Sequence, residues 1–186
     1  MVTTKLVTAE ELWSIGEDDH HRYALIRGEL YRMSPAGFRH GVIASDFHLP
    51  LAAFVRERGL GLVATNDSGF VLERDPDSVL GPDIAFVRAD RLPPPNEFDG
   101  FLELPPDLAV EIISPSQSGP FVAAKVAAYL NAGVAMVVFV RPARKTVSVH
   151  RPGRETIVLG IGDVFDGEDV LPGFQLPLTE LFRDNP

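Results

Sequence analysis

The sequence predicts an α/β fold with a mixed sheet flanked by helices, and three observations lead to this prediction. Residues 108–113 and 134–140 are nearly continuous apolar runs, which are typical of strands buried on both faces. Residues 121–131 lie between them and have helical apolar spacing, so the segment forms a strand–helix–strand unit with two parallel strands. Residues 40–58 also have helical spacing and precede several short runs of strand length.

The chain has 186 residues, a length that suits one domain. We divide it into a helical lead-in over residues 1–21, a core over residues 22–142, and a C-terminal hairpin and tail over residues 143–186. Hydrophobic residues make up 45% and charged residues 23% of the chain, proportions that favour a folded globular protein over a disordered one.

One helix is predicted in the lead-in. Thr8 and Glu11 have the spacing of a capping box, which predicts a helix over residues 9–15 that ends at Gly16. A loop over residues 17–21 should follow this helix.

The core begins with a predicted hairpin over residues 23–33, because two short apolar runs are joined around Arg27 and Gly28. The helix over residues 40–58 follows, and Pro50 inside it predicts either a kink or two separate helices. Short apolar runs then predict three strands, and a long surface loop comes after them. The strands span residues 62–65, 69–73 and 83–88, and the loop spans residues 89–106.

The C-terminal part is predicted as a hairpin followed by a tail. Residues 146–150 and 156–159 form the two strands of the hairpin. Residues 171–182 form the tail, which contains an apolar closing segment.

The chain contains no cysteine, which excludes a disulfide scaffold, a thiolate zinc site and a cysteine nucleophile. We expect a cytoplasmic protein, because no segment has the pattern of a signal peptide or a membrane span. The net charge of −9 by itself speaks against nucleic acid as a partner, since phosphate binding relies on Lys and Arg. The bases are grouped, however, and residues 141–154 contain five bases and no acid, so a basic strip can exist despite the total.

Glu111 is the most informative residue, because it lies in the middle of a strand that is predicted to be buried. A buried carboxylate is costly unless it is paired or coordinated, so a compensating group must face it. One candidate is a cation between Glu111 and Asp83, which follows Pro82, because carboxylates and water suit Mg²⁺ or Mn²⁺. The other candidate is Lys125, which lies on the inner face of the next helix and can reach back over the strand.

Each of these residues also has a purely structural interpretation. Asp83 can cap the start of its strand, Glu111 can pair with a buried arginine, and Lys125 can extend along the helix into solvent. Taken one by one, the three residues therefore leave the choice between a catalytic site and a structural role open.

The order of Pro82, Asp83, Glu111 in a central strand and a lysine resembles the PD-(D/E)XK nuclease motif. More specifically, the chain resembles a large bacterial family of restriction-endonuclease-like proteins over most of its length. The matching stretches are YALIRGELYRMSP (23–35), FRHGVI (38–43), PDIAFV (82–87), PDLAVEIISPS (106–116) and KVAAYLNAGV (125–134).

The resemblance implies a restriction-endonuclease-like core and metal-dependent hydrolysis of phosphodiester bonds. Carried over residue by residue, it implies Asp83 and Glu111 as ligands of Mg²⁺ or Mn²⁺ and the backbone carbonyl of Ile112 as a further ligand. It also implies Lys125 as the catalytic lysine. The general motif has its lysine two residues after the glutamate, where this chain has Ile113, so the lysine has moved to position 125.

Some positions depart from the family pattern, and two further residues are candidates for the site. Family members often carry acidic residues where this chain has Ala24, Arg27 and Gln117. The resemblance makes His40 a candidate cleft residue, and Glu29, which follows a predicted turn, is a candidate neighbour of the metal. Both are otherwise interpreted as surface residues.

The basic run supplies five candidates for DNA contact, although it can also be a solvated hairpin: Arg141, Arg144, Lys145, Arg151 and Arg154. We therefore predict a Mg²⁺-dependent endonuclease that acts on DNA, most simply double-stranded DNA. A homodimer is expected, because a symmetric pair of chains cuts both strands more easily than one domain does. The alternatives are a non-catalytic DNA-binding or assembly module that retains the fold, and a buried ion network with a purely structural role.

Overall fold

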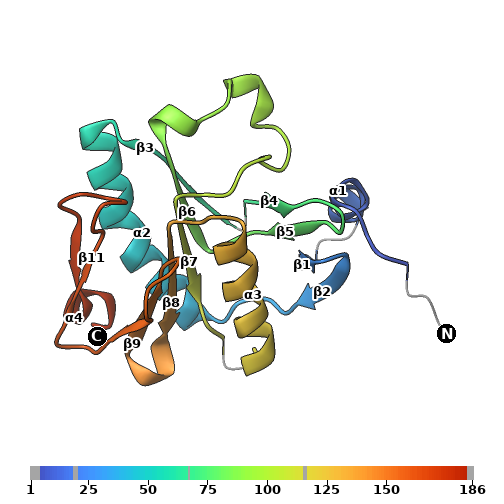
Figure 1. The fold of residues 1–186 in the computed structure, drawn as a ribbon. Helices are drawn as coiled ribbons and strands as arrows, with labels where there is room; N and C mark the ends of the chain where they lie inside the picture. Colours follow the sequence, from blue (N-terminus) through green and yellow to red (C-terminus); the bar gives the residue numbers. More distant parts are fainter. Residues whose placement is uncertain (1–4, 19–20, 67, 115–116, 184–186) are drawn as a thin grey trace.

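The structure is a computed structural model that describes residues 5–18, 21–66, 68–114 and 117–183. The strands of the main sheet are β3 (Gly61–Thr65), β6 (Ile84–Arg88), β7 (Leu108–Ile112), β8 (Met136–Arg141), β9 (Thr146–His150) and β10 (Ile157–Leu159). They lie in the order β10-β9-β8-β7-β6-β3 (Figure 1). β7 and β8 run parallel, and the other neighbouring pairs are antiparallel. The predicted mixed sheet and its parallel pair are confirmed.

Two helices, α2 (Phe38–Arg58) and α3 (Gly119–Asn131), lie on opposite faces of the main sheet (Figure 1). The side chains of β7 separate the two faces, since successive residues of a strand point to opposite sides. Val110 packs with α2 in one hydrophobic cluster, and Ala109 packs with α3 in another. Glu111 shares its face of the strand with Ala109, so it points towards α3.

A second, antiparallel sheet packs against α3. Its strands are β1 (Arg22–Ile26), β2 (Glu29–Met33), β4 (Phe70–Glu73) and β5 (Ser78–Leu80), in the order β2-β1-β5-β4. Arg27 and Gly28 have φ angles of 50° and 79° and form the two-residue turn of the predicted hairpin. Strand β5 was not predicted, because three residues are too few to show a period.

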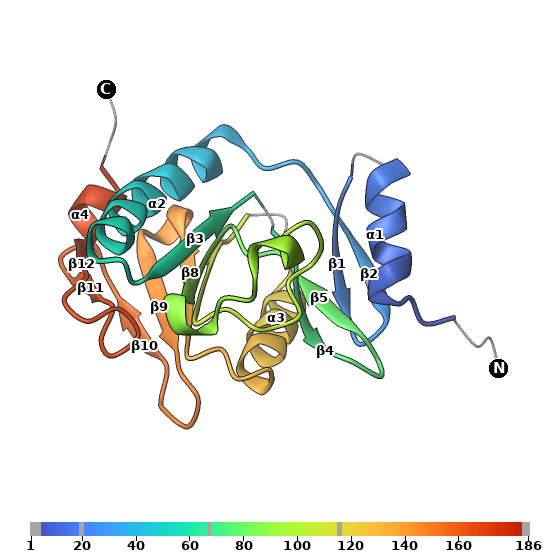
Figure 2. The ribbon, with the colours of Figure 1, turned by 90° about the horizontal axis from the view of Figure 1, so that it is seen from above.

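Helix α1 (Ala9–Asp18) packs against the second sheet, and Figure 2 shows it beside β1 and β2 at one end of the molecule. The predicted capping box is confirmed. Oγ1 of Thr8 accepts a hydrogen bond from the N–H of Glu11 at 3.2 Å, and Oε2 of Glu11 accepts one from the N–H of Thr8 at 3.1 Å. The start of the helix is thereby fixed by its own sequence.

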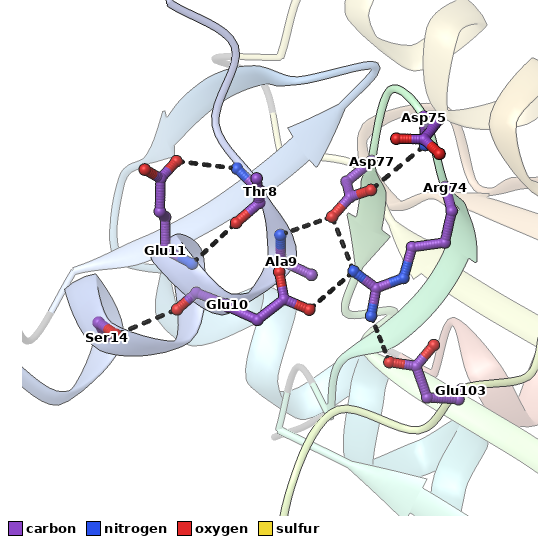
Figure 3. Close-up of polar contacts among 9 residues, drawn as sticks. All are labelled: Thr8, Ala9, Glu10, Glu11, Ser14, Arg74, Asp75, Asp77 and Glu103. Atoms are coloured by element: carbon purple, nitrogen blue, oxygen red, sulfur yellow. Dashed lines mark hydrogen bonds and ion pairs between the residues drawn. The ribbon is translucent and has the colours of Figure 1, made fainter.

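Charged side chains attach α1 to the β4–β5 hairpin (Figure 3). Oδ2 of Asp77 accepts hydrogen bonds from the N–H of Ala9 and from NH1 of Arg74, both at 2.8 Å. Arg74 also lies 2.9 Å from Oε1 of Glu10 and 2.5 Å from Oε1 of Glu103. The helix, the hairpin and the long loop that carries Glu103 are therefore joined by one arginine.

The predicted end of α1 is wrong. The helix passes Gly16 and ends at Asp18, so residues 17–18 are helical and do not belong to the predicted loop. A single glycine costs a helix only about 1 kcal/mol, which the cap and the packing of α1 outweigh. Residues 19–20 of the predicted loop lie outside the described residues.

The other two long helices begin earlier than predicted. α2 begins at Phe38 and continues through Pro50 as one helix, so the alternative of two separate helices is wrong. α3 begins at Gly119, because the side chain of Ser118 accepts a hydrogen bond from the N–H of Phe121 at 3.4 Å. Proline suits the first turn of a helix, so the glycine and proline before Phe121 do not delay its start.

The segment between β6 and β7 is mostly irregular, as predicted. It contains two short 3-10 helices, η1 (Ala89–Arg91) and η2 (Pro95–Glu97). Leu102 pairs with the edge of β4, since its N–H donates to the carbonyl of Gly69 and its carbonyl accepts from Val71, both at 2.9 Å. The loop is thus fastened to the second sheet.

The C-terminal segment is more ordered than the predicted tail. It contains the pair of strands β11 (Val164–Asp166) and β12 (Gln175–Pro177), and helix α4 (Leu178–Leu181). Phe165 and Leu176 pack with α2 in the largest hydrophobic cluster. In the part of the chain that the structure describes, no helix combines the length and the apolar character that crossing a membrane requires.

Candidate active site

Asp83 and Glu111 come together because they belong to neighbouring strands. Asp83 directly precedes β6, and Glu111 lies near the end of β7. The antiparallel register pairs Ile84 with Val110, so one further step places Asp83 opposite Glu111. Directly opposite residues have Cβ atoms about 4.5–5.5 Å apart, so the two carboxylates share one face of the sheet.

The carboxylate of Asp83 is held by three groups. Oδ2 accepts a hydrogen bond from the N–H of Ile112 at 2.7 Å and lies 3.2 Å from Nε2 of His40. Oδ1 lies 3.5 Å from NH2 of Arg22. Burial alone raises the pKa of Asp83, but the hydrogen bonds from His40 and Ile112 outweigh it, and the pKa lies below its usual value. Asp83 is therefore a carboxylate at neutral pH.

Glu111 is held by two side chains of α3. Its Oε1 forms an ion pair with Nζ of Lys125 and accepts a hydrogen bond from the hydroxyl of Tyr129 at 2.7 Å. Lys125 and Tyr129 are four residues apart on the helix, so both reach the same face. Burial raises the pKa of Glu111 above its usual value, although the charge of Lys125 acts in the opposite direction. Lys125 thus supplies the compensating charge that the buried carboxylate requires.

These side chains line a pocket of about 310 Å³. Asp83, Glu111 and Lys125 form part of its wall, together with Arg22 and His40. The pocket lies where β1, β2 and the first turns of α2 and α3 meet the ends of β6 and β7. A ligand in it would touch both carboxylates and the lysine at once.

Two residues of the site were not anticipated from the sequence. Tyr129 was interpreted only as part of the packed face of the helix, although its position four residues after Lys125 was the available signal. Arg22 gave no signal, because its proximity to Asp83 depends on the placement of the second sheet against the first.

The structure also separates His40 from Glu29, the two further candidates for the site. His40 lies at the pocket, in contact with Asp83. Glu29 is exposed, accepts a hydrogen bond from the hydroxyl of Tyr31 at 2.8 Å and is not among the residues that line the pocket. Gln117, which departs from the family pattern, does line it.

Comparison with known proteins identifies the family. The model of the Uma2 family, described as "Putative restriction endonuclease", matches residues 9–179. The chain belongs to the Uma2 family. The crystal structure of "a putative nuclease belonging to DUF820" from Anabaena variabilis is similar to this Uma2 chain, with a TM-score of 0.82 and 22% sequence identity. The alignment covers 95% of this chain and 97% of the other, so the two share a fold. No curated protein matches the chain.

In this Uma2 chain, the pocket contains oxygen donors that suit a hard metal ion. The hydrogen bond from Tyr129 and the ion pair with Lys125 both use Oε1 of Glu111, which itself lines the pocket. Among the residues that the structure describes, no group of three or more His, Asp and Glu side chains is arranged to hold a metal. Asp83 and Glu111 would therefore need further oxygen atoms, and Mg²⁺ commonly takes these from backbone carbonyls, substrate and water. The residues fit a two-carboxylate site of this kind.

A larger groove adjoins the pocket of the Uma2 chain. Its volume is about 1060 Å³, and it shares His40 and Gln117 with the pocket. Arg141 and Arg144 of the predicted basic run line this groove, as does Arg39 from α2. The groove therefore brings positive charge from two separate segments to the entrance of the site.

The other bases of the run are placed differently. Arg151 forms ion pairs with Glu168 and Asp169, and its side chain is only 9% exposed. Arg154 lies 3.0 Å from Oε2 of Glu168. Both charges are offset by acids of the C-terminal segment, which weighs against direct contact with phosphate. Lys145 lies in the turn before β9, with a φ of 49°.

Proposed function

We propose that this Uma2-family chain is a Mg²⁺-dependent endonuclease that hydrolyses phosphodiester bonds in DNA. The observation that carries the proposal is that Asp83, Glu111 and Lys125 line one pocket, with the lysine ion-paired to the buried glutamate. The description of the family and the similarity of the fold to a structure described as a nuclease support this reaction class.

The proposed metal ligands are the carboxylates of Asp83 and Glu111 and the backbone carbonyl of Ile112. A bound Mg²⁺ would polarise the scissile phosphate and lower the pKa of a water molecule. Mn²⁺ accepts the same oxygen ligands and should replace it.

The other residues of the pocket would stabilise charge in the transition state or fix the orientation of the two carboxylates. The ammonium group of Lys125 would stabilise the negative charge that develops on the phosphate oxygens in the transition state. Tyr129 fixes the orientation of Glu111 through its hydrogen bond to Oε1. His40 and the N–H of Ile112 fix Asp83 in the same way and act as positioning groups.

The proposed path of the DNA backbone is the adjoining groove. Arg141 and Arg144 line it and would contact phosphates beside the scissile one. Because such contacts release condensed counterions, binding should weaken steeply as the salt concentration rises.

We further propose that two copies act together on double-stranded DNA, one on each strand. Analytical ultracentrifugation checks this part, since a chain of 20.3 kDa and its dimer sediment at different rates. A monomer at all concentrations, with and without DNA, would rule out the paired arrangement but leave the site untouched.

The test of the function is nicking of supercoiled plasmid DNA in the presence of Mg²⁺ or Mn²⁺. Wild type should cleave, and Asp83→Ala, Glu111→Ala and Lys125→Ala should each reduce the rate by roughly 10²–10³-fold, as loss of a group that stabilises the transition state does. Chelation of the metal should stop the reaction. Cleavage that survives in all three variants would contradict the site.

Asp107→Asn is the matched control. Asp107 is also a buried acid next to β7, but it pairs with Arg91 at 2.7 Å and is not one of the residues that line the pocket. This variant should cleave like wild type. DNA binding by wild type without metal binding and without cleavage would favour the non-catalytic module, because the ion pair of Glu111 and Lys125 is complete without a metal.

A further inference from the structure

A second hollow lies next to the candidate active site, on the other side of Arg22. It has a volume of about 360 Å³, and its walls include Trp13 from α1, Tyr23 from β1 and Phe101 from the long loop. Arg22 lines this hollow and the catalytic pocket alike, and its NH2 lies 3.5 Å from Oδ1 of Asp83. The two cavities therefore meet at one cationic side chain.

Two of the aromatic rings that line this hollow contact each other edge to face. Trp13 and Phe101 form an edge-to-face pair with ring centroids 5.0 Å apart and an interplanar angle of 86°. In such a pair, the ring that presents its edge keeps both of its faces clear of the other ring. The side chain of Trp13 is 40% exposed, so solvent and ligands can reach it.

The walls of the hollow are fastened to each other. Arg74 joins Glu10, on the helix that carries Trp13, to Glu103, two residues after Phe101 (Figure 3). Gly69 permits the close approach of the loop, because a Cβ atom at this position would lie 2.2 Å from Cδ1 of Phe101. The hollow is thus a built feature in which two distant segments are clamped around a space.

We propose that this hollow binds one unstacked nucleobase of the DNA strand whose phosphate lies at Asp83 and Glu111. The inference rests on the proposed function and names the part of the substrate that the site selects. Every nucleobase has a flat face that stacks on aromatic side chains, and a base leaves the duplex to reach such a pocket. Arg22 lies between the hollow and Asp83, where a guanidinium group can bind the phosphate attached to that base. The expected substrate preference is for DNA with an unpaired nucleotide at the cut.

Fluorescence provides a direct test, because Trp13 is the only tryptophan of the chain. A short single-stranded oligodeoxynucleotide, added without divalent metal so that no cleavage occurs, should quench the emission of Trp13. An oligonucleotide of equal length and charge, built from abasic nucleotides, should leave the emission unchanged. The proposal would be overturned if the normal and the abasic oligonucleotide quench the emission equally, or if neither of them quenches it.

Variants of the walls give the second measurement. Phe101→Leu and Trp13→Leu should weaken binding of the normal oligonucleotide about 5- to 150-fold, the range for losing a stacked aromatic side chain, and leave binding of the abasic one unchanged. Fluorescence anisotropy of a labelled oligonucleotide measures both affinities. Trp13→Phe keeps a ring and should recover most of the binding. Thermal unfolding of each variant verifies that it is folded.

Phe98→Leu is the matched control. Phe98 is 41% exposed, close to the 40% of Trp13, and lies in the same loop as Phe101, but it does not line the hollow. It should bind like wild type, and an equal loss in this variant would overturn the proposal. The two proposals fail separately. Cleavage without selective quenching would support the proposed nuclease activity and contradict nucleobase binding in the hollow. Selective quenching without cleavage would support nucleobase binding and contradict the nuclease activity.

Discussion

The candidate active site and the polar cluster that attaches α1 (Figure 3) contain the same kinds of side chains but differ in how much water reaches them. In the site, Glu111 and Lys125 are each 3% exposed and pair with each other. In the cluster of Figure 3, two of the three carboxylate partners of Arg74 are open to solvent, since the side chains of Glu10 and Glu103 are 71% and 63% exposed, whereas Asp77 is buried. The pair of the site therefore lies inside the protein, and the pairs of Arg74 with Glu10 and Glu103 lie at its surface.

The difference in burial bears on the role of the Glu111–Lys125 pair and of the cluster around Arg74. Burying an ion pair carries a desolvation penalty that often exceeds the attraction between the charges, so apolar residues would serve stability equally well. The fold keeps Glu111 and Lys125 nonetheless, and places them at a pocket. A buried pair of this kind fits the proposed catalytic role, whereas the exposed pairs of Arg74 with Glu10 and Glu103 join separate segments.

The largest expected effect comes from breaking the buried pair. Lys125→Met should lower the free energy of unfolding by about 3–5 kcal/mol, because it leaves Glu111 buried without a partner. The double variant Glu111→Leu with Lys125→Met should recover most of that loss and remain inactive. Urea denaturation measures the stabilities. A double variant as unstable as the single one would show that the pair is structural after all.

The buried end of the cluster in Figure 3 should give the next largest effect. Asp77→Ala removes the acceptor for the N–H of Ala9 and for Arg74, and hydrogen bonds that involve a charged group are worth about 1.5–3 kcal/mol each. We expect a total loss of stability of about 1.5–3 kcal/mol, measured by urea denaturation, because the bond to the partly exposed Arg74 is screened by solvent and adds little. Amide hydrogen exchange should be faster in α1 than in α3, and uniform acceleration would contradict a local role.

The acid limb of the stability curve tests the charge of Asp77. Burial alone raises the pKa of Asp77, but hydrogen bonds from the N–H groups of Ala9 and Asp75, together with the charge of Arg74, lower it below the ordinary value of 3.8. A group with a lowered pKa in the folded state stabilises the protein above the unfolded-state pKa and loses this contribution as the pH falls. Wild type should therefore lose more stability below about pH 4 than Asp77→Asn does. Thermal unfolding across acidic pH measures this, and parallel curves would exclude the effect.

The smallest effect is expected where the cluster is exposed. Arg74→Met should cost less than Asp77→Ala, because solvent and salt screen its exposed pairs with Glu10 and Glu103, and the buried Asp77 keeps its hydrogen bond from the N–H of Ala9. The difference from wild type should shrink further at high salt, as thermal unfolding in a salt series would show. A loss as large as that of Lys125→Met would remove the contrast between the two clusters.

Local sequence patterns predicted much of the fold. The capping box of Thr8 and Glu11, the turn at Arg27 and Gly28, and the strand–helix–strand unit with its parallel pair are all present. Short elements such as β5, β11 and β12 were not predicted, because three residues are too few to show a period. The end of α1 was also missed, since a single glycine costs a helix only about 1 kcal/mol and is therefore a weak terminator.

The candidate site was predicted in part. Lys125 was one of two candidates to compensate Glu111, the other being a cation shared with Asp83, and Lys125 and Glu111 do form an ion pair. The contacts of Arg22 with Asp83 and of Arg151 with the acids of the C-terminal segment were not expected. These contacts join segments that are distant in the chain, and no local pattern records them.

By itself, the sequence determined the secondary structure around the site and the presence of a buried carboxylate that needed a partner. Both follow from local patterns, because apolar periodicity and helix capping depend on residues only a few positions apart. Only the tertiary structure decided which groups meet that carboxylate. The order of β6 and β7 places Asp83 opposite Glu111, and the packing of α3 brings Lys125 and Tyr129 onto its Oε1. The physical reason is that the desolvation and pairing of a charge depend on the three-dimensional neighbours of the side chain, which strand order and helix packing select.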